Sequence, residues 1–413
     1  MRIVTAVALA YSIVHFALSG VRYPLTDPNL AKFDEQLPAL VEHLRTGAPV
    51  SIHNPVQYGP VFFFVAHPLL LAADGSRTTF AALLYALQLA CAAGAFALTC
   101  ATLRRRVWSA SGPSWPLTVS WLAVLWLNFA PLYSTIAVKS VETWELFFVS
   151  LALWAHVSER PWLAAFAIAV SGLVKLLPLA FIYYWLLTDR RMFARACAAV
   201  LVLLLVGHAL YGPEMGLAYL AGRTGGTFGF SYGMTWHENV SLKAAIAKLL
   251  GHLAPAGYQV DLTPLQLTAT ILIGDAAIVA IGVWLSRYLL RTTAARTPAR
   301  IVWEWSFFTV ATLILSPNTT LEYATLALGA CSYALVRLAD DARRPRAAGI
   351  AFGGALLWLG GLLPRRLLHR VAFVETLNAM TGNTHLTPPE AYQYYCFPLL
   401  GLALLALTLW RLR

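Results

Sequence analysis

Apolar runs recur along the whole of this 413-residue chain. Many of them approach or exceed the ~17 to 20 residues that an α-helix needs to cross a bilayer. Hydrophobic residues make up 59% of the sequence, above the roughly 45 to 50% of ordinary soluble domains. No polar region between the runs is long enough to form a separate soluble domain. The sequence therefore predicts an all-α polytopic membrane protein, with residues 1–413 in one transmembrane domain.

The runs predict a bundle of about 11 to 12 transmembrane helices. A retained first helix is favoured over a cleaved signal peptide, because it would tether the polar loop that follows. The candidate spans are residues 3–20, 80–103, 116–137, 142–157, 161–174, 177–188, 195–212, 265–289, 301–316, 320–337, 347–363 and 395–410.

Short arginine clusters at the ends of the runs indicate the orientation. These clusters lie at residues 104–106, 190–195, 287–300 and 343–346, and the positive-inside rule places them in the cytoplasm. Topology thus explains most of the net charge of +11, and nucleic acid is not expected as a partner. Both termini then face the cytoplasm. The outer segments are residues 21–79, which include a predicted re-entrant or interfacial helix at 57–73, and residues 213–262, 317–319 and 364–394. The turns near Lys175 and around Lys139 and Glu142 face the same side.

The first outer loop is unusually acidic for a chain that is only 12% charged. Its carboxylates are Asp27, Asp34, Glu35 and Glu42. Apolar residues between 33 and 44 recur at helical spacing, which predicts a short amphipathic helix in the membrane interface. Pro38 suits a first turn and Gly47 a C-terminal stop, so Asp34 falls at or just before the helix start. Asp34 is then either an N-terminal cap or a general base at the mouth of a membrane cavity.

A lysine interrupts the long apolar run at residues 165–185. Because Pro178 follows Lys175 by three residues, we expect the segment to break into two short helices there. A lysine buried in a membrane is costly without an anion. Lys175 either snorkels to the interface from a helix end or binds a lipid phosphate. Arg365 and Arg366 belong to a basic run that falls outside, against the orientation rule. Either a helix is miscounted, or these cations bind an anion.

Other polar residues face the same compartment and are candidate substrate contacts. They are Tyr58 at the start of the re-entrant segment, His237 and Asn239 in the large outer loop, and Glu322 and Tyr323 after a Ser-Pro turn. Capping and turn formation are an equal alternative for each of them. Asp275, alone in the middle of a span, is the carboxylate that a transporter would use, or it pairs with a neighbouring helix.

Several catalytic signatures are absent from the sequence. It has no Gly-rich phosphate loop, HExxH, GxSxG or CxxC, so nucleotide hydrolysis, zinc proteolysis and acyl-serine chemistry have no support. The five cysteines lie in or beside apolar runs without metal-ligand spacing. No metal and no cofactor are expected.

In their order along the chain, these features resemble the GT-C superfamily of membrane glycosyltransferases. The chain is most similar to glycosyltransferase family 87, the polyprenol-phosphate-mannose-dependent type. Each motif is weak alone, but their order spans most of the chain. The segments that carry the resemblance are FDEQLPALVEHLRTG, QYGPVFFFVAHPLL, SGLVKLLPLAFIYYWLLTDRR, HENVSLKAAIAKLL and LSPNTTLEYATLAL.

The resemblance implies transfer of mannose or another hexose from a polyprenyl phosphate to a lipid or glycan acceptor outside the cytoplasm. By position it assigns the base to Asp34, with Asp27 and Glu35 as fallbacks, and a donor-phosphate contact to Lys175. Glu35 is also a candidate substrate contact. A polyprenyl phosphate leaves without protonation, so one carboxylate base suffices and the anomeric carbon is inverted. The acceptor side departs from the family pattern, because Gly59 replaces one of two prolines and Glu322 stands in a segment where a Trp and a His are usual.

Two functions from other classes remain as alternatives. A lipid or lipid-linked-sugar transporter would also need a groove for a polyprenyl chain, and a membrane scaffold would leave the loop carboxylates merely solvated. The leading interpretation is a multi-pass protein of the bacterial inner or plasma membrane with its active site on the outer face. No oligomeric state follows from the sequence.

Overall fold

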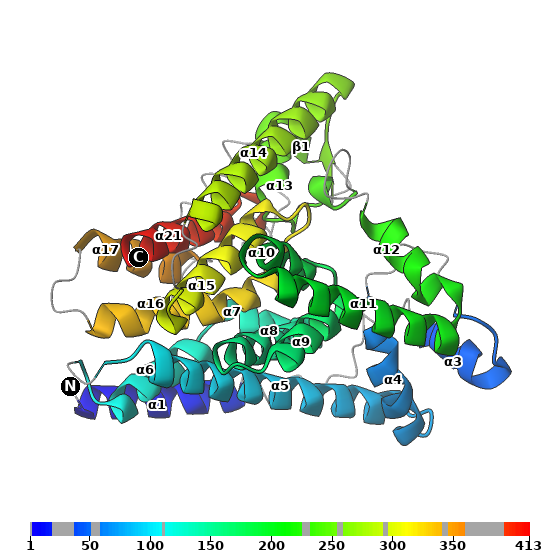
Figure 1. The fold of residues 1–413 in the computed structure, drawn as a ribbon, viewed down its shortest axis with the longest axis horizontal. Helices are drawn as coiled ribbons and strands as arrows, with labels where there is room; N and C mark the ends of the chain where they lie inside the picture. The colour runs from blue at the N-terminus through cyan, green and yellow to red at the C-terminus, as the bar shows by residue number, and fades with distance from the viewer. Residues whose placement is uncertain are drawn as a thin grey trace. The chain divides into compact units, whose positions relative to one another are not determined.

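The computed structural model of the protein describes residues 2–18, 37–50, 58–109, 112–224, 232–253, 259–291, 296–340, 346–359 and 392–413. These residues are almost entirely helical (Figure 1). The strands β1 (His252–Leu253) and β2 (Val260–Asp261) form a two-residue antiparallel hairpin. The prediction of an all-α polytopic membrane protein is confirmed.

The chain divides into two compact units, unit 1 (Met1–Arg106 and Tyr133–Thr224) and unit 2 (Val107–Leu132 and Gly225–Arg413). Helix α7 (Ala130–Ala137) runs across a boundary between them. The other helices of unit 1 are α1 (Arg2–His15), α3 (Leu37–Thr46), α4 (Pro60–Ala72), α5 (Arg77–Arg106), α8 (Glu142–Val157), α9 (Pro161–Val174), η2 (Leu177–Leu179), α10 (Ala180–Thr188), α11 (Arg190–Tyr211), η3 (Pro213–Met215) and α12 (Leu217–Thr224).

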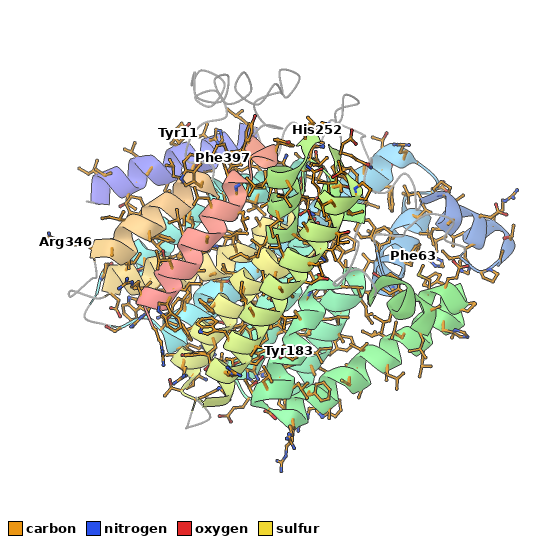
Figure 2. The ribbon with its side chains drawn as sticks, turned by 90° about the horizontal axis from the view of Figure 1, so that it is seen from above. Tyr11, Phe63, Tyr183, His252, Arg346 and Phe397 are labelled. Atoms are coloured by element: carbon orange, nitrogen blue, oxygen red, sulfur yellow. The ribbon has the colours of Figure 1, made fainter. Side chains whose placement is uncertain are left out.

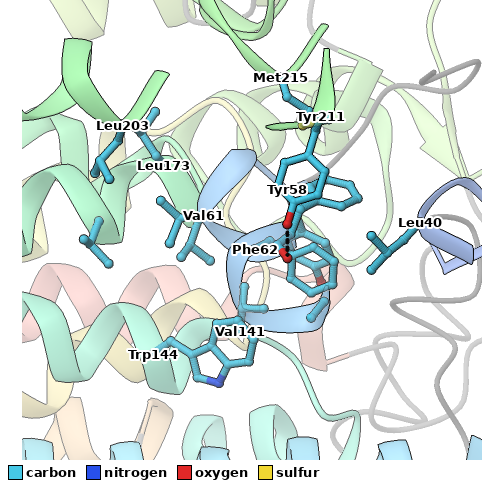
Figure 3. Packing of buried hydrophobic residues seen from close by; sticks show 14 of the residues in the cluster. Leu40, Tyr58, Val61, Phe62, Val141, Trp144, Leu173, Leu203, Tyr211 and Met215 are labelled. Atoms are coloured by element: carbon cyan, nitrogen blue, oxygen red, sulfur yellow. Dashed lines mark hydrogen bonds between the residues drawn. The ribbon is translucent and has the colours of Figure 1, made fainter. Parts of the chain in front are cut away.

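Unit 1 is built on successive packing of α5, α8, α9 and α11, with α4 against α9 and α11. Small residues permit close approach of these helices, as is common where helices associate in a membrane. Alanines fill the buried face of α9, and a Cβ at Gly94 of α5 would meet the Phe147 ring at 2.8 Å. Figure 3 shows the core at the start of α4, where Tyr211 donates a hydrogen bond to the carbonyl of Phe63 at 3.1 Å.

Unit 2 is a bundle in which α21 packs against α15, α16 and α17, while α13 packs against α14. Figures 1 and 2 show α17 and α21 side by side. The helices of unit 2 are α6 (Trp115–Leu127), η4 (Tyr232–Thr235), α13 (Leu242–Leu250), α14 (Pro264–Arg291), α15 (Pro298–Leu315), η5 (Tyr323–Ala327), α16 (Leu328–Asp340), α17 (Arg346–Trp358) and α21 (Phe397–Arg411).

By length and composition, α5, α11 and α14 qualify as membrane spans among the described residues, and α6 with α7 make a fourth if they count as one span. Other predicted spans appear as shorter helices, so the expected number of about 11 to 12 crossings stays a prediction. Helix α4 has 13 residues and is ~20 Å long, which is too short to cross the ~30 Å of a hydrocarbon core. This length suits the re-entrant or interfacial helix expected at residues 57–73.

The expected helix in the first outer loop is confirmed as α3. It ends where predicted, because Gly47 takes a left-handed φ of 71° and its N–H donates to the carbonyl of His43 at 2.8 Å. Leu40 is buried in the core of unit 1, whereas Glu42 and Arg45 pair on the exposed face. The structure thus positions the segment that directly follows Asp34 and Glu35, which themselves lie outside the described residues.

Candidate active site

Lys175 lies at a helix break, as its sequence context predicts. Helix α9 ends at Val174 because Lys175 is extended, with φ −142° and ψ 145°. Pro178 then enforces the break, since its ring would clash with the carbonyl four residues earlier in a continuous helix. The chain resumes as η2 and α10. The Lys175 side chain is buried, and its Nζ donates to Glu142 Oε1 at 2.5 Å.

A second buried carboxylate lies beside this ion pair. Glu142 and Glu145 occupy the first turn of α8, where the helix dipole favours negative charge. Their spacing of three residues places both on one face of the helix. Glu145 is fully buried, and among the described residues neither of its carboxylate oxygens has a hydrogen-bond partner. One ammonium therefore faces two carboxylates in a region from which water is excluded.

Tyr58 is brought to the same cluster from the start of α4. The N–H of Gly59 donates to the carbonyl of Val174 at 2.8 Å, and a Cβ at Gly59 would meet the carbonyl oxygen of Leu173 at 2.2 Å. Only glycine fits this close approach of two backbones. The Lys175 Nζ consequently lies 5.3 Å from the centroid of the Tyr58 ring, and burial raises the pKa of Tyr58 to about 12.

This cluster, made of Tyr58, Glu142, Glu145 and Lys175, can hold a cation, hold a proton and donate from a phenol. Because two carboxylates share one ammonium here, an anion could bind only by taking the place of a carboxylate at Lys175. A phosphate that reached Lys175 would compete with Glu142 for the same ammonium. We call this group the Lys175 cluster.

A second group of candidate residues meets in unit 2. Asn239 Nδ2 donates to the carbonyls of Gly233 and Pro317 at 2.7 and 2.8 Å, and its Oδ1 accepts from the N–H groups of Ser241 and Thr319 at 2.9 and 3.0 Å. All four hydrogen-bonding positions of the Asn239 amide are therefore used within the protein. Asn239 thus links the segment that follows Tyr232 to the Ser-Pro turn, together with the backbone bond from Val240 to Thr319.

Lys248 of α13 also holds the loop that contains His237 and Asn239. Its Nζ donates to the carbonyls of His237 and Asn239 at 2.8 and 2.5 Å, and to that of Gln393 at 3.1 Å. Burial lowers the pKa of Lys248. The His237 side chain is buried in this region, and the partly buried Lys248 ammonium holds the backbone of the loop that carries it.

The last two candidates follow the Ser-Pro turn. Glu322 is buried, and its Oε2 accepts from the Thr320 hydroxyl at 2.6 Å. Tyr323 begins η5 and is half-buried. The structure thus brings His237, Asn239, Glu322 and Tyr323 into unit 2, and Tyr58 and Lys175 into unit 1.

Of the two interpretations of Asp275, the structure supports the pairing with a neighbouring helix. Lys243 of α13 is buried, and its Nζ donates to Asp275 Oδ1 at 2.6 Å across the contact with α14. The intramembrane carboxylate that a transporter would use is therefore engaged in an ion pair between helices.

Four predicted site residues, Asp34, Glu35, Arg365 and Arg366, lie outside the described residues. Within the described part of the chain, no group of three or more His, Cys, Asp and Glu side chains is arranged to hold a metal ion.

Comparison with known proteins decides the family. The model of glycosyltransferase family 87 matches residues 57–317, which is more than half of the chain. The chain belongs to glycosyltransferase family 87. It is thus an integral membrane glycosyltransferase: the family gives the activity class, and the apolar helices agree with a place in the membrane. No curated protein sequence matches the chain.

Solved structures that are similar to this chain include two crystal structures of ArnT from Cupriavidus metallidurans. The one bound to undecaprenyl phosphate is 14% identical with a TM-score of 0.46, and the match covers 98% of this chain and 77% of that chain. The apo structure is 16% identical with a TM-score of 0.45, and the match covers 98% of this chain and 76% of that chain.

Sequence reasoning missed the acidic half of the Lys175 cluster. The sequence alone places Glu142 in an outer turn and does not single out Glu145. A signal existed, because two carboxylates three residues apart at the start of an apolar span are costly in a membrane without a cation. In this family 87 chain that cation is Lys175.

Proposed function

We propose that this family 87 protein transfers a sugar from a polyprenyl-phosphate donor to a lipid or glycan acceptor on the extracytoplasmic side of the membrane. The sugar is a hexose, with mannose as the first choice, and the membrane is the bacterial inner or plasma membrane. The observation that carries the proposal is the family match over residues 57–317, which contains the whole of the Lys175 cluster.

Lys175 is proposed to stabilise the donor phosphate. A buried ammonium in a site of low dielectric stabilises negative charge that develops on the leaving phosphate, without any rearrangement at the moment of reaction. Glu142 and Tyr58 hold Lys175 in place until the donor arrives. Arg365 and Arg366 are proposed as further donor-phosphate contacts on the basis of the sequence.

Asp34 is proposed as the general base. The acceptor hydroxyl gives its proton to the Asp34 carboxylate, and its oxygen forms a bond to the anomeric carbon of the sugar. The bond from that carbon to the phosphate oxygen breaks at the same time, and its electron pair leaves with the polyprenyl phosphate. Attack opposite the leaving group inverts the anomeric carbon, and the phosphate needs no proton to leave.

The remaining candidate residues are proposed to shape the substrate site. Glu35, Tyr58, Glu322 and Tyr323 would contact substrate directly, as would His237. Asn239 would act by positioning the loop that carries His237, because the hydrogen bonds of its amide are all made within the protein.

Substitution of Asp34 by Asn tests this function in the purified chain, supplied with polyprenyl-phosphate mannose and extracted membrane glycolipids as acceptors. General-base catalysis contributes about 10²- to 10⁴-fold, so we expect the rate of Asp34→Asn to fall within that range while donor binding persists. The anomeric configuration of the product, determined by NMR, should be inverted relative to the donor.

Glu42→Gln is the matched control, because Glu42 lies in the same loop and its side chain is exposed beside Arg45. It should transfer sugar at the wild-type rate. Wild-type transfer by Asp34→Asn would sink the assignment of the base. Donors bearing glucose or galactose, tested alongside, would distinguish the sugar.

A further inference from the structure

A cavity in unit 2 has no part in the proposed reaction. It has a volume of about 370 Å³ and lies where the ends of α14, α15, α16 and α21 meet. The side chains that give it its character are three arginines and three aromatic residues: Arg300, Arg337, Arg413, Tyr288, Trp303 and Tyr333. This volume falls in the range of ligand pockets, about 300 to 1,000 Å³.

The arginines of the cavity carry more charge than their partners neutralise. Glu304 is fully buried, and it accepts from Arg300 at 3.0 Å and from Arg296 at 3.0 Å, so one carboxylate serves two guanidinium groups. No ion pair within the described part of the chain involves Arg337 or Arg413. A C-terminal carboxylate on Arg413 would lower this excess of positive charge by one, and positive charge would still remain.

Arg337 provides an unused donor inside the cavity wall. Its side chain is partly buried and hydrogen-bonds Tyr333, but its Nε is inaccessible to water and has no partner among the described residues. A buried donor without an acceptor costs about 1 to 3 kcal/mol in free energy of folding. A ligand oxygen in the cavity would supply that acceptor.

Aromatic side chains place the cavity at a membrane–water boundary. Trp284, Tyr288, Trp303 and Trp410 contact one another around the ends of their helices, and Trp284 and Trp410 are exposed. Tryptophan and tyrosine collect at the level of lipid headgroups. Arg413 also lies over the Tyr288 ring at 4.7 Å, which holds its guanidinium at the edge of the cavity.

Topology alone does not explain this arrangement. The positive-inside rule accounts for arginines at helix ends in general, such as the exposed Arg104 and Arg105 at the end of α5. It does not require three arginines to line one cavity, nor a buried Nε to be left without an acceptor. The first turn of α15 also lies in the wall through Ala299 and Arg300, and a helix N-terminus favours an anion.

We propose that this cavity binds the phosphate group of an anionic lipid headgroup. Arginine forks match phosphate oxygens with two parallel hydrogen bonds, and aromatic walls suit the glycerol and the first methylenes of a lipid. Basic pockets between transmembrane helices on the cytoplasmic side are known to hold such headgroups. The orientation rule assigns this arginine-rich end of the helices to that side.

The test is lipid binding to the full-length chain, purified and delipidated in a mild detergent. Native mass spectrometry would be used to titrate phosphatidylglycerol and, separately, diacylglycerol, which lacks the phosphate. We expect saturable binding of phosphatidylglycerol but not diacylglycerol, and about tenfold weaker binding by Arg337→Gln. Because Arg337 is partly buried, Arg413→Gln serves as a second variant at an exposed position, and it should show a loss in the same direction.

Arg411→Gln is the matched control, since Arg411 is exposed on the same helix end and does not line the cavity. It should bind phosphatidylglycerol like the wild type. Glycerol 3-phosphate is added as a competitor: displacement of the lipid at equal affinity would support the phosphate site but assign it to a soluble ligand. Equal lipid binding by all three variants and the wild type would overturn the proposal. Sugar transfer is not needed for any of these readouts.

Discussion

The sequence leaves two interpretations of Lys175 open, a snorkelling lysine and a phosphate contact, and the ion pair with Glu142 bears on both. The Lys175 Nζ is buried against Glu142 at 2.5 Å, so the lysine does not snorkel to the interface, and a donor phosphate would have to compete with Glu142 for its ammonium. The free energy lost when such a pair leaves water is about as large as the free energy gained from its attraction, so the pair by itself is weak evidence for a stabilising role. A functional reason to keep a buried cation at a helix break is therefore worth testing.

Substitutions at both ends of this pair separate structure from chemistry. Lys175→Met leaves Glu142 buried without its cation, which should lower the free energy of unfolding by about 3 to 5 kcal/mol. The double variant Lys175→Met/Glu142→Gln should regain part of that loss, because no buried charge then lacks its partner at Glu142. Thermal unfolding in detergent measures both effects.

Transfer assays on the same variants give the second readout. If Lys175 contacts the donor phosphate, the double variant regains stability but not sugar transfer. Recovery of both together would show that Lys175 is only a structural cation. Glu42→Gln is the control for loss of a paired carboxylate, because its exposed pair with Arg45 should contribute only about 0 to 1 kcal/mol.

At the scale of helices, the contact between α13 and α14 depends on one glycine. The stem of Lys243 passes over Gly274 on its way to Asp275, and a Cβ at Gly274 would lie 2.8 Å from Lys243 Cγ. Since Cγ is near the backbone, the Lys243 side chain cannot move away without giving up its ion pair. A contact between two helices thus depends on the absence of a methyl group.

Gly274→Ala should therefore lower the free energy of unfolding by about 1 to 3 kcal/mol through overpacking, as measured by thermal unfolding in detergent. The matched control is Gly282→Ala on the same helix, where a Cβ meets nothing within 4 Å. That substitution should stabilise the protein by up to about 1 kcal/mol, because alanine favours a helix. Equal effects of the two substitutions would show that the ion pair of Lys243 and Asp275 does not depend on Gly274.

Helices whose ends are encoded by adjacent residues were predictable. Gly47 ends α3, and the combination of Lys175 with Pro178 ends α9, because left-handed caps and proline act through the local backbone. The partners of buried charges were not predictable in the same way. Glu142 lies 33 residues before Lys175, and only the packing of α8 on α9 brings them together.

At the scale of the molecule, the apolar runs were enough to predict an all-α membrane protein but not which helix forms a complete crossing. Runs with polar or proline interruptions, such as residues 161–188, fold as short helices rather than as one span. Four of the ten predicted site residues, including Asp34, lie outside the described residues, and the assignment of Asp34 rests on its position in the sequence. The orientation of the chain follows from its arginine clusters.

Single cysteines test that orientation in intact cells, using a chain in which the exposed Cys197 is replaced by Ser. His252 and Arg346 are both exposed, and Figure 2 labels both. Residues 213–262 are expected outside and residues 343–346 in the cytoplasm, because arginine clusters remain inside. His252→Cys should therefore react with a membrane-impermeant maleimide added to intact cells, whereas Arg346→Cys should react only after permeabilisation. The reverse pattern would invert the topology, and it would also place the arginine-lined cavity in the outer leaflet and the proposed site of sugar transfer in the cytoplasm.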